Sequence, residues 1–387
     1  MYTNKEIWNV SYPIFLGLLA QNIINVTDTA FLGRVGEVEL GASAMGGLFY
    51  ICVFTIAFGF SIGSQILIAR RNGEGRYKDV GPVMIQGGTF LLGLAVLMFG
   101  LTHLLAPSVV RLLISSDSIF DATMEFLNWR IFGFFFAFIN VMFRALYIGI
   151  TRTKVLTMNA VVMALVNVLL DYILIFGKFG MPEMGIKGAA IASVMAEAAS
   201  LAFFLIYTYA KVDFKKFGLN HWQKIDFSLL GKILSISCFT MVQYFLAMAT
   251  WFVFFIAIER LGQRELAIAN IVRSIYIVML IPVQALSTTT NSLVSNLIGA
   301  GKPEQVMGLC GRMIRICYYF VLPLGILIAL FPELVLRIYT DNLDLIAGSV
   351  SSLWVMLSSY LIAVPAFIFF FSVSGTGNTQ TEQGCRR

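Results

Sequence analysis

Long apolar runs, separated by short polar stretches, follow one another along nearly the whole chain. Each run is about 20 residues or longer, which is the length that an α-helix needs to cross the hydrocarbon core of a bilayer. The pattern predicts an all-α polytopic membrane protein with ten spans, over residues 9–33, 44–69, 81–105, 126–150, 155–177, 187–210, 229–258, 267–297, 312–331 and 349–374.

The first of these spans carries polar residues that lipid would disfavour. Gln21, Asn25 and Asp28 are spaced by four and then three residues, so they share one face of a helix. A carboxylate inside a span costs roughly 2.5–3.5 kcal/mol on insertion scales, so this face must turn towards protein or water. Pro13 removes one backbone hydrogen bond and permits a bend. We expect a moving helix with a titratable group; a structural polar contact inside a helix bundle is the alternative.

Composition agrees with a membrane protein and gives no sign of an enzyme. Of the 387 residues, 58% are hydrophobic and only 12% are charged, and the mean hydropathy is +0.84. The five cysteines form no CxxC pair, so a disulfide framework or a zinc site is not expected. A membrane enzyme would need a nucleophile, a metal cluster or a phosphate loop, and the sequence has no His pair, HExxH or P-loop. No cofactor is expected.

The placement of charge predicts the orientation. The net charge is +6, and most lysines and arginines of the loops fall on the side of the N-terminus, which places that end in the cytoplasm. The longest polar interruption, residues 211–226, is basic and lies on the same side. We interpret it as a linker between two lobes; a contact with anionic lipids is the alternative.

An internal repeat relates the two halves of the chain in one ungapped register. Adding 226 to a residue number in the first half repeatedly gives a related residue, as for Ser11 and Ser237, Gly36 and Gly262, Glu39 and Glu265, Tyr50 and Tyr276, Ser61 and Ser287, Gly73 and Gly299, and Gly149 and Gly375. An even number of spans separates the copies, so they have the same orientation. We predict a six-helix N-terminal lobe (1–210), a cytoplasmic linker (211–228) and a C-terminal lobe (229–387) that rock about a central cavity.

The second lobe is shorter than the repeat predicts. The first copy has six predicted spans, and the second has four before the chain ends at residue 387. We expect a truncated end rather than a design with ten helices.

Several motifs, taken in order, resemble the multidrug and toxic compound extrusion (MATE) family. Pro13 and Asp28 stand on the first span as in its DinF-type branch, followed by FLGRVGEVELGA. The glycine-rich IARRNGEGR leaves the second span and has SNLIGAGKPE as its repeat partner. The fourth span ends in YIGITRTK, the tenth ends in SGTGNTQ, and the fifth holds NVLLDYILIFG. The combination covers nearly the whole chain and is specific, although no single motif would be.

The resemblance implies a V-shaped transporter of two lobes and twelve helices. Such a protein exports small amphipathic, often cationic compounds in exchange for protons or sodium. It would lie as a monomer among the lipids of a bacterial inner (plasma) membrane and would bind no nucleic acid.

The resemblance also implies the positions of the functional residues. Asp28, Asn167 and Asp171 would form a site for a proton or Na+, completed by the carbonyl of Ala189 and by Ser193. Pro13 would be the bend point of the first span, and Gln21 and Asn140 would line the cavity. Two acids in one low-dielectric space favour a cation or proton site, and a structural polar knot is the alternative.

Other charged residues in the spans are open to two interpretations. Glu197 either joins the polar cavity or lies near the inner half of its helix. Arg144 and Arg273 are expected to be interface or salt-bridge residues rather than substrate ligands, because a fixed positive charge would repel cationic drugs.

The second lobe has no acid at the positions that match the proposed cation site. Asp28 maps to Phe254, and Ala247 stands where NorM-type relatives place a glutamate. We therefore expect coupling to reside in the N-terminal lobe alone. The alternatives to a cation-coupled drug exporter are a flippase for lipid-linked sugars of the same superfamily, which would favour a basic cavity, and a truncated, non-functional homologue.

Overall fold

The computed structural model describes residues 2–114, 116–220, 224–259, 262–339 and 342–377. The centre of the predicted linker (221–223) and the last ten residues lie outside these ranges. Within them all regular elements are helices, in the order α1 Asn4–Val35, α2 Glu37–Gly73, η1 Tyr77–Asp79, α3 Val80–Leu113, α4 Asp117–Arg130, α5 Gly133–Gly149, α6 Lys154–Ile175, α7 Gly185–Lys211, α8 Phe227–Glu259, α9 Gln263–Gly299, η2 Pro303–Gln305, α10 Val306–Leu330, α11 Pro332–Leu336 and α12 Leu343–Gly375.

Among the described residues, nine helices are long and apolar enough to span a membrane, and α4 with α5 can form a tenth span bent by 54°. The prediction of an all-α polytopic membrane protein is therefore confirmed. The fourth predicted span differs in shape from the expectation, because it consists of two helices that meet at an angle.

The helix boundaries themselves recur at the predicted offset of 226 residues. α2 and α9 begin and end at equivalent residues, and so do η1 and η2. The pair α4 and α5 is equivalent to α12, which begins at Leu343 and ends at Gly375 without a break. The two copies therefore share one plan, and the bend between α4 and α5 belongs to the first copy alone.

The first helix is unbroken. Thr3 caps its start in a reciprocal capping box with Glu6. Pro13 lies inside α1, and its carbonyl accepts a hydrogen bond of 3.0 Å from the Thr157 hydroxyl of α6. Pro13 leaves the carbonyl of Asn9, four residues earlier, without its helical donor. The Thr153 hydroxyl donates to this carbonyl at 3.4 Å, and α1 continues through the proline without interruption.

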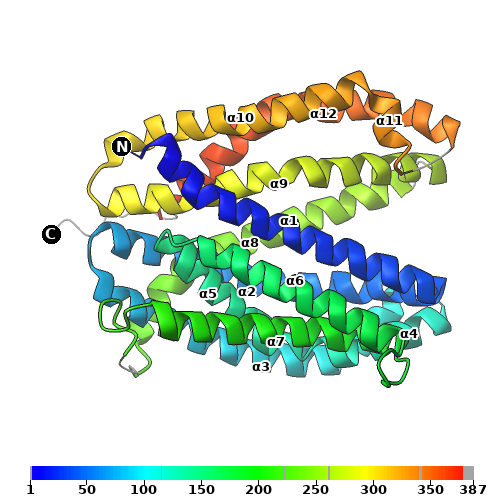
Figure 1. Ribbon diagram of the computed structural model, residues 1–387, viewed down its shortest axis with the longest axis horizontal. Helices are drawn as coiled ribbons and strands as arrows, with labels where there is room; N and C mark the ends of the chain where they lie inside the picture. Colours follow the sequence, from blue (N-terminus) through cyan, green and yellow to red (C-terminus); the bar gives the residue numbers. More distant parts are fainter. Residues whose placement is uncertain (1, 115, 221–223, 260–261, 340–341, 378–387) are drawn as a thin grey trace.

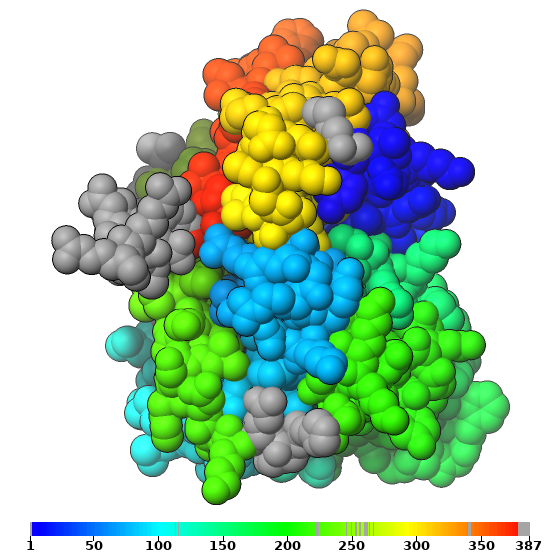
Figure 2. Space-filling view, turned by 90° about the vertical axis from the view of Figure 1, so that its left-hand side faces the viewer, coloured from blue at the N-terminus to red at the C-terminus, as the bar shows by residue number. Residues whose placement is uncertain are grey.

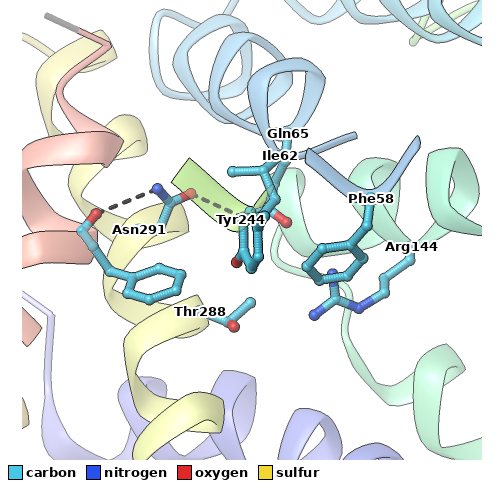
Figure 3. Close-up of a pocket in the computed structure, with 8 residues that line it drawn as sticks. Phe58, Ile62, Gln65, Arg144, Tyr244, Thr288 and Asn291 are labelled. Atoms are coloured by element: carbon cyan, nitrogen blue, oxygen red, sulfur yellow. Dashed lines mark hydrogen bonds between the residues drawn. The ribbon is translucent and has the colours of Figure 1, made fainter. Parts of the chain in front are cut away.

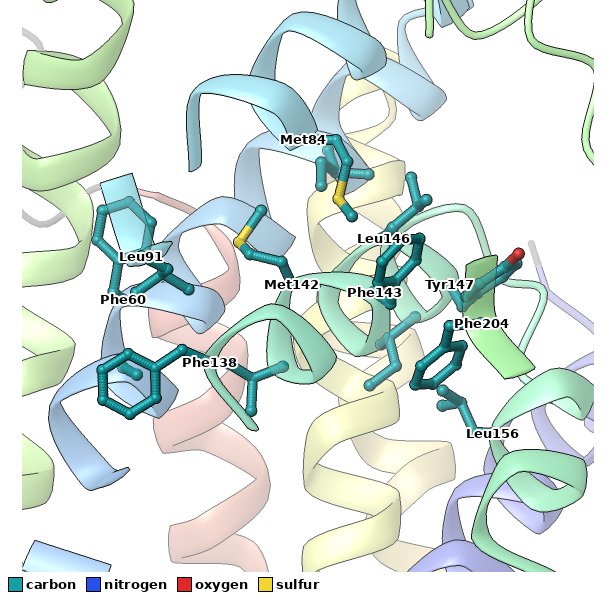
Figure 4. Close-up of a cluster of buried hydrophobic side chains, with 14 of the residues drawn as sticks. Phe60, Met84, Leu91, Phe138, Met142, Phe143, Leu146, Tyr147, Leu156 and Phe204 are labelled. Carbon is teal, nitrogen blue, oxygen red and sulfur yellow. The ribbon is translucent and has the colours of Figure 1, made fainter. Parts of the chain in front are cut away.

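Two bundles make up the molecule, with α2–α7 in one and α9–α12 in the other (Figure 1). Each bundle has its own apolar core. The core between α2, α3, α5 and α7 includes Phe60, Phe138 and Phe204 (Figure 4). The division follows the predicted lobes, whose exact limits stay a prediction.

The first helix of each copy crosses from one bundle to the other. Near the start of α1, Ile7 belongs to the core of the second bundle, and Trp8 stacks on Phe320 of α10 at 5.3 Å. Near the start of α8, Ile233 belongs to the core of the first bundle. The bundles are thus interlocked at the end of the molecule where α1 and α8 begin. We call this the inner end; it is the end predicted to be cytoplasmic.

The described part of the linker is folded onto the first bundle. Phe217 is buried, its carbonyl accepts from the amide of Gly81 at 2.7 Å, and Gln86 of α3 donates to the Lys224 carbonyl at 2.8 Å. The linker is therefore anchored rather than loosely suspended between the lobes.

Candidate functional site

Two carboxyl groups meet inside the first bundle. Asp28 lies near the outer end of α1, and Asp171 lies near the end of α6, which packs along α1. Asp171 is completely buried, Asp28 is partly buried, and the two carboxyl groups interact electrostatically. Asn167, one turn before Asp171, is 1% exposed. The structure thus brings together the three residues that the resemblance assigned to one site.

The oxygens of this cluster lack donors. In the described structure no hydrogen-bond partner is present for Oδ1 of Asp28, Oδ1 of Asn167 or either carboxylate oxygen of Asp171. Buried oxygens without partners are energetically costly, and the cost is relieved by a shared proton or a bound hard cation, which prefers oxygen ligands. The cluster therefore has the donor set of a cation site.

An apolar layer covers the outer side of the acids. Leu32 and Ile175 each follow one acid by a single turn, and they share a buried cluster with Ala189 of α7. The start of α7 is held against the end of α6 by a hydrogen bond of 2.9 Å from the amide of Met184 to the Leu174 carbonyl. Ala189 therefore lies in the apolar layer next to the two acids, and its role in binding a cation stays a prediction. Ser193, one turn further along α7, is partly buried.

A second acid site, unforeseen as such from the sequence, adjoins the first. Arg130 at the end of α4 forms a two-pronged ion pair with Glu197 of α7, with N–O distances of 2.7 and 2.9 Å. The Tyr50 hydroxyl donates to the same carboxylate at 3.1 Å, and the guanidinium lies 3.6 Å from the centre of the Tyr50 ring. Asn140 donates to the Glu197 carbonyl at 2.9 Å. Glu197 thus belongs to a polar cluster with Arg130, Tyr50 and Asn140.

Arg130 links the two clusters electrostatically, because its charge also acts on Asp28. Glu197 neutralises Arg130, which leaves Asp28 and Asp171 as a pair of acids with no cation of their own among the described ion pairs. The sequence signal for Arg130 was its position within a span, since an intramembrane arginine usually has an intramembrane acid as its partner.

Two predicted cavity residues stay apart from this buried cluster. Asn25 and Gln21 are exposed on α1, one and two turns before Asp28 respectively. The polar face of α1 therefore runs from the buried acids to an open surface.

A separate, narrow pocket lies between the two bundles, with a cavity volume of about 10 Å³, which is room for about one water molecule. It is lined by Phe58, Ile62, Gln65, Arg144, Tyr244, Thr288, Asn291 and Phe371, which come from both bundles (Figure 3). Arg144 is therefore an interface residue, as expected, but the described ion pairs do not include it. Arg273, for which the same role was expected, is exposed on α9.

Two interlocked helical bundles, a buried acidic site in one and a pocket between them, define a polytopic membrane transporter. The family model MatE matches residues 13–173 and 239–382, so the chain belongs to the MatE family. Membership confirms the family predicted from the motifs, and it identifies a transporter rather than an enzyme.

Individual relatives agree with this assignment. The chain is 25% identical to the probable multidrug resistance protein NorM of Thermotoga maritima, over 97% of this chain and 80% of that protein. It is 26% identical to the protein of the same name from Agrobacterium fabrum, over 85% of this chain and 71% of that one. The crystal structure of MATE in the straight conformation has a TM-score of 0.88, with 19% identity over 96% of this chain and 82% of that chain.

Proposed function

We propose that this chain is a secondary active antiporter that exports small amphipathic drugs in exchange for H+ or Na+. The relatives' names support drug export, and the buried carboxyl pair of Asp28 and Asp171 is the single observation that supports coupling to a cation. The bacterial relatives and the basic inner end support a location in a bacterial plasma membrane with the N-terminus in the cytoplasm, and a monomer stays a prediction.

The position of Asp28 on α1 suggests how a cation acts on the whole molecule. α1 packs on α6 next to the acids, and its start is buried in the second bundle around Ile7. A proton or Na+ neutralises the repulsion between the acids and so favours a closer fit of α1 on α6. Because α1 touches both bundles, cation binding and drug binding influence each other reciprocally.

The contacts between the bundles support alternating access. At the inner end, the side chain of Gln65 on α2 donates to that of Asn291 on α9 at 2.9 Å. Ser292 donates to the Ile148 carbonyl at 2.7 Å, and Asn296 donates to the Gly149 carbonyl at 3.1 Å. We call these contacts the inner seam. Figure 2 shows the inner end, where the turn after α2 (blue) lies directly against the turn after α9 (yellow).

The outer halves of the crossing helices carry exposed side chains. Asn25 and Val26 of α1 and Trp251 and Phe254 of α8 are all exposed. The structure is therefore closed at the inner end, as an exporter would be after it has turned its pocket outwards. A rocking motion that opens the inner seam would expose the same pocket to the other side.

The flippase alternative is less well supported. A pyrophosphate-linked lipid would favour a basic cavity, and Arg144 is the one basic residue among the eight that line the interlobe pocket.

The test is gradient-driven export from proteoliposomes, with ethidium and rhodamine B as drugs and a proton or a sodium gradient imposed in turn. We expect Asp28→Asn and Asp171→Asn each to abolish export, because neither variant can exchange the full charge of the cation. Pro13→Ala should slow export and leave cation binding largely intact. Asp121→Asn, which alters an exposed carboxylate of α4, is the matched control and should export at the parent rate. If Asp28→Asn exports at the parent rate under the same gradient, the coupling site is wrong.

A further inference from the structure

We infer that the inner end of the first bundle holds a binding site for an anionic phospholipid, whose headgroup phosphate is bound by Arg152 and Lys216. The site is built on the folded linker, to which drug export assigns no role. It concerns the membrane around the chain and does not depend on the proposed export function.

Three loops of the inner end meet at one buried aromatic ring. Phe217 of the linker is buried, and its carbonyl accepts from the amide of Gly81 at 2.7 Å. The ring of Tyr77 in η1 meets the Phe217 ring edge to face at 6.0 Å. The turn between α5 and α6 adds Arg152, whose guanidinium lies 5.8 Å from the centre of the Phe217 ring. Figure 2 shows this end, where the linker (green) lies against the turn after α2 (blue). The site therefore has a fixed base made by three separate loops.

Two cations lie against this base. Besides Arg152, the ammonium of Lys216 lies 4.6 Å from the centre of the Tyr77 ring and 5.6 Å from that of Phe217. Both basic residues are exposed, and the described ion pairs include neither of them. An aromatic ring attracts a cation through its face and leaves N–H donors of that cation free for a second partner. A guanidinium and an ammonium at one ring are the donors that suit a phosphate, because the guanidinium can form two parallel hydrogen bonds to it.

The acids of this region have other partners. Asp213 accepts from the backbone amide of Lys216 at 3.0 Å, and Asp226 accepts from two backbone amides at the start of α8. Asp79 of η1 forms an ion pair with Arg76. The linker, residues 211–226, carries four lysines against two aspartates. An anionic ligand would therefore meet an excess of positive charge here.

Exposed apolar side chains beside the lysines favour a lipid over a soluble anion. Tyr209 near the end of α7 is 83% exposed, and Ile225 and Phe227 at the start of α8 are 55% and 79% exposed. Lys211 and Lys224 stand next to them in the chain and are also exposed. Aromatic and apolar side chains interleaved with lysines at the ends of spans are typical of the layer where headgroups meet acyl chains. A soluble phosphate would make no use of these apolar groups.

A built site differs from the general attraction between a basic inner end and anionic lipids. General attraction depends on every exposed cation at this end to a similar extent. Lys302 is such a cation, exposed in the turn after α9 on the second bundle, and the described cation–ring contacts do not include it. The inference therefore predicts that lipid binding depends on Arg152 and Lys216 far more than on Lys302.

Native mass spectrometry of the purified chain in detergent tests the site. The chain is titrated with phosphatidylglycerol or phosphatidylcholine, and inorganic phosphate is added as a competitor. We expect tighter binding of phosphatidylglycerol than of phosphatidylcholine, with no displacement by inorganic phosphate. Arg152→Gln and Lys216→Gln should each weaken the first bound phosphatidylglycerol about fivefold, and the double variant about thirtyfold, as expected for basic residues at an anionic lipid surface.

Lys302→Gln is the matched control, because it removes the same charge from the inner end of the second bundle. It should change the affinity for phosphatidylglycerol by less than about twofold. Equal weakening by Lys302→Gln, equal affinities for the two lipids, or parent-like binding by the double variant would each overturn the site. Displacement of the lipid by inorganic phosphate would assign the cluster to a soluble anion and overturn the lipid as its ligand.

Discussion

The buried charges of the N-terminal bundle differ in how they are balanced. Arg130 and Glu197 form a neutral, well-bonded pair, whereas Asp28 and Asp171 face each other without a cation. A buried ion pair contributes little net stability compared with apolar residues, but a single unpaired member is strongly destabilising. The pair therefore fixes α4 against α7, and the acids beside it have no counter-charge among the described ion pairs.

Removing one member of this pair should be more harmful than removing both. Glu197→Gln leaves Arg130 buried without a counter-charge and should lower the free energy of unfolding by about 3 kcal/mol. The double variant Arg130→Met with Glu197→Met should recover most of that loss, because no charge is left unpaired. Thermal unfolding in detergent measures both. If the double variant is no more stable than Glu197→Gln, the balance of charge is not what holds α4 on α7.

The sequence predicted the acids of this region better than their partners. Asp28 and Asp171 stand out because any carboxylate in an apolar span requires an explanation. Arg130 and Glu197 are 67 positions apart in the chain, and their pairing also depends on the angle at which α4 meets α5. Neither is encoded in local spacing. The sequence also could not predict that Arg144 has no acid among the described ion pairs, because this depends on which residues of both lobes surround the pocket.

At the scale of elements, the break between α4 and α5 is the main departure from the repeat. The equivalent stretch of the second copy runs through α12 without interruption. Gly133 stands at the break, and a methyl group on it would collide with the ends of the Arg130, Glu197 and Tyr50 side chains. The break therefore coincides with the position where the ion pair needs space. Hydropathy predicted the length of this span and could not predict its bend, because the apolar pattern continues across it.

Gly133→Ala should consequently destabilise the protein by about 1–3 kcal/mol, because the added methyl displaces a buried ion pair that cannot move into solvent. Gly93→Ala is the matched control on α3, where a methyl group would meet nothing within 4 Å. That change should be neutral or stabilising by up to about 1 kcal/mol, since alanine favours a helix interior over glycine. Thermal unfolding of the two variants decides the point, and equal stability of both would contradict the crowding at Gly133.

At the scale of the whole molecule, the inner seam joins the two copies through equivalent residues. Gln65 and Asn291 are separated by 226 residues, so a contact between them lies on the axis that relates the lobes. The surrounding contacts are reciprocal as well. Gly73 approaches the backbone of Asn296, and Gly299 approaches the backbone of Arg70. Gly299 is the repeat partner of Gly73, and Asn296 is the repeat partner of Arg70. The register was readable from the sequence, but the meeting of equivalent residues was not, because a repeat defines an axis without showing which side of it is closed.

The inner seam lies on the axis between the lobes and should open and close during the transport cycle. A covalent bridge across the seam should therefore stop transport. Gln65→Cys with Asn291→Cys, in a chain whose native cysteines are replaced by serine, can be bridged by a short bis-methanethiosulfonate reagent. We expect bridging to abolish gradient-driven export and reduction of the bridge to restore it, because the lobes cannot separate at the inner end. The unbridged double variant reports any effect of the substitutions themselves.

The matched control places the bridge within one lobe. Arg264→Cys with Asp344→Cys replaces an exposed ion pair of 2.7 Å that joins α9 to α12 at the outer end. Bridging this pair leaves the two bundles free to move relative to each other and should not slow export. Undiminished export with the Gln65–Asn291 positions bridged would show that the seam stays closed throughout the cycle, and the lobes would then have to exchange substrate by a route other than rocking about this axis.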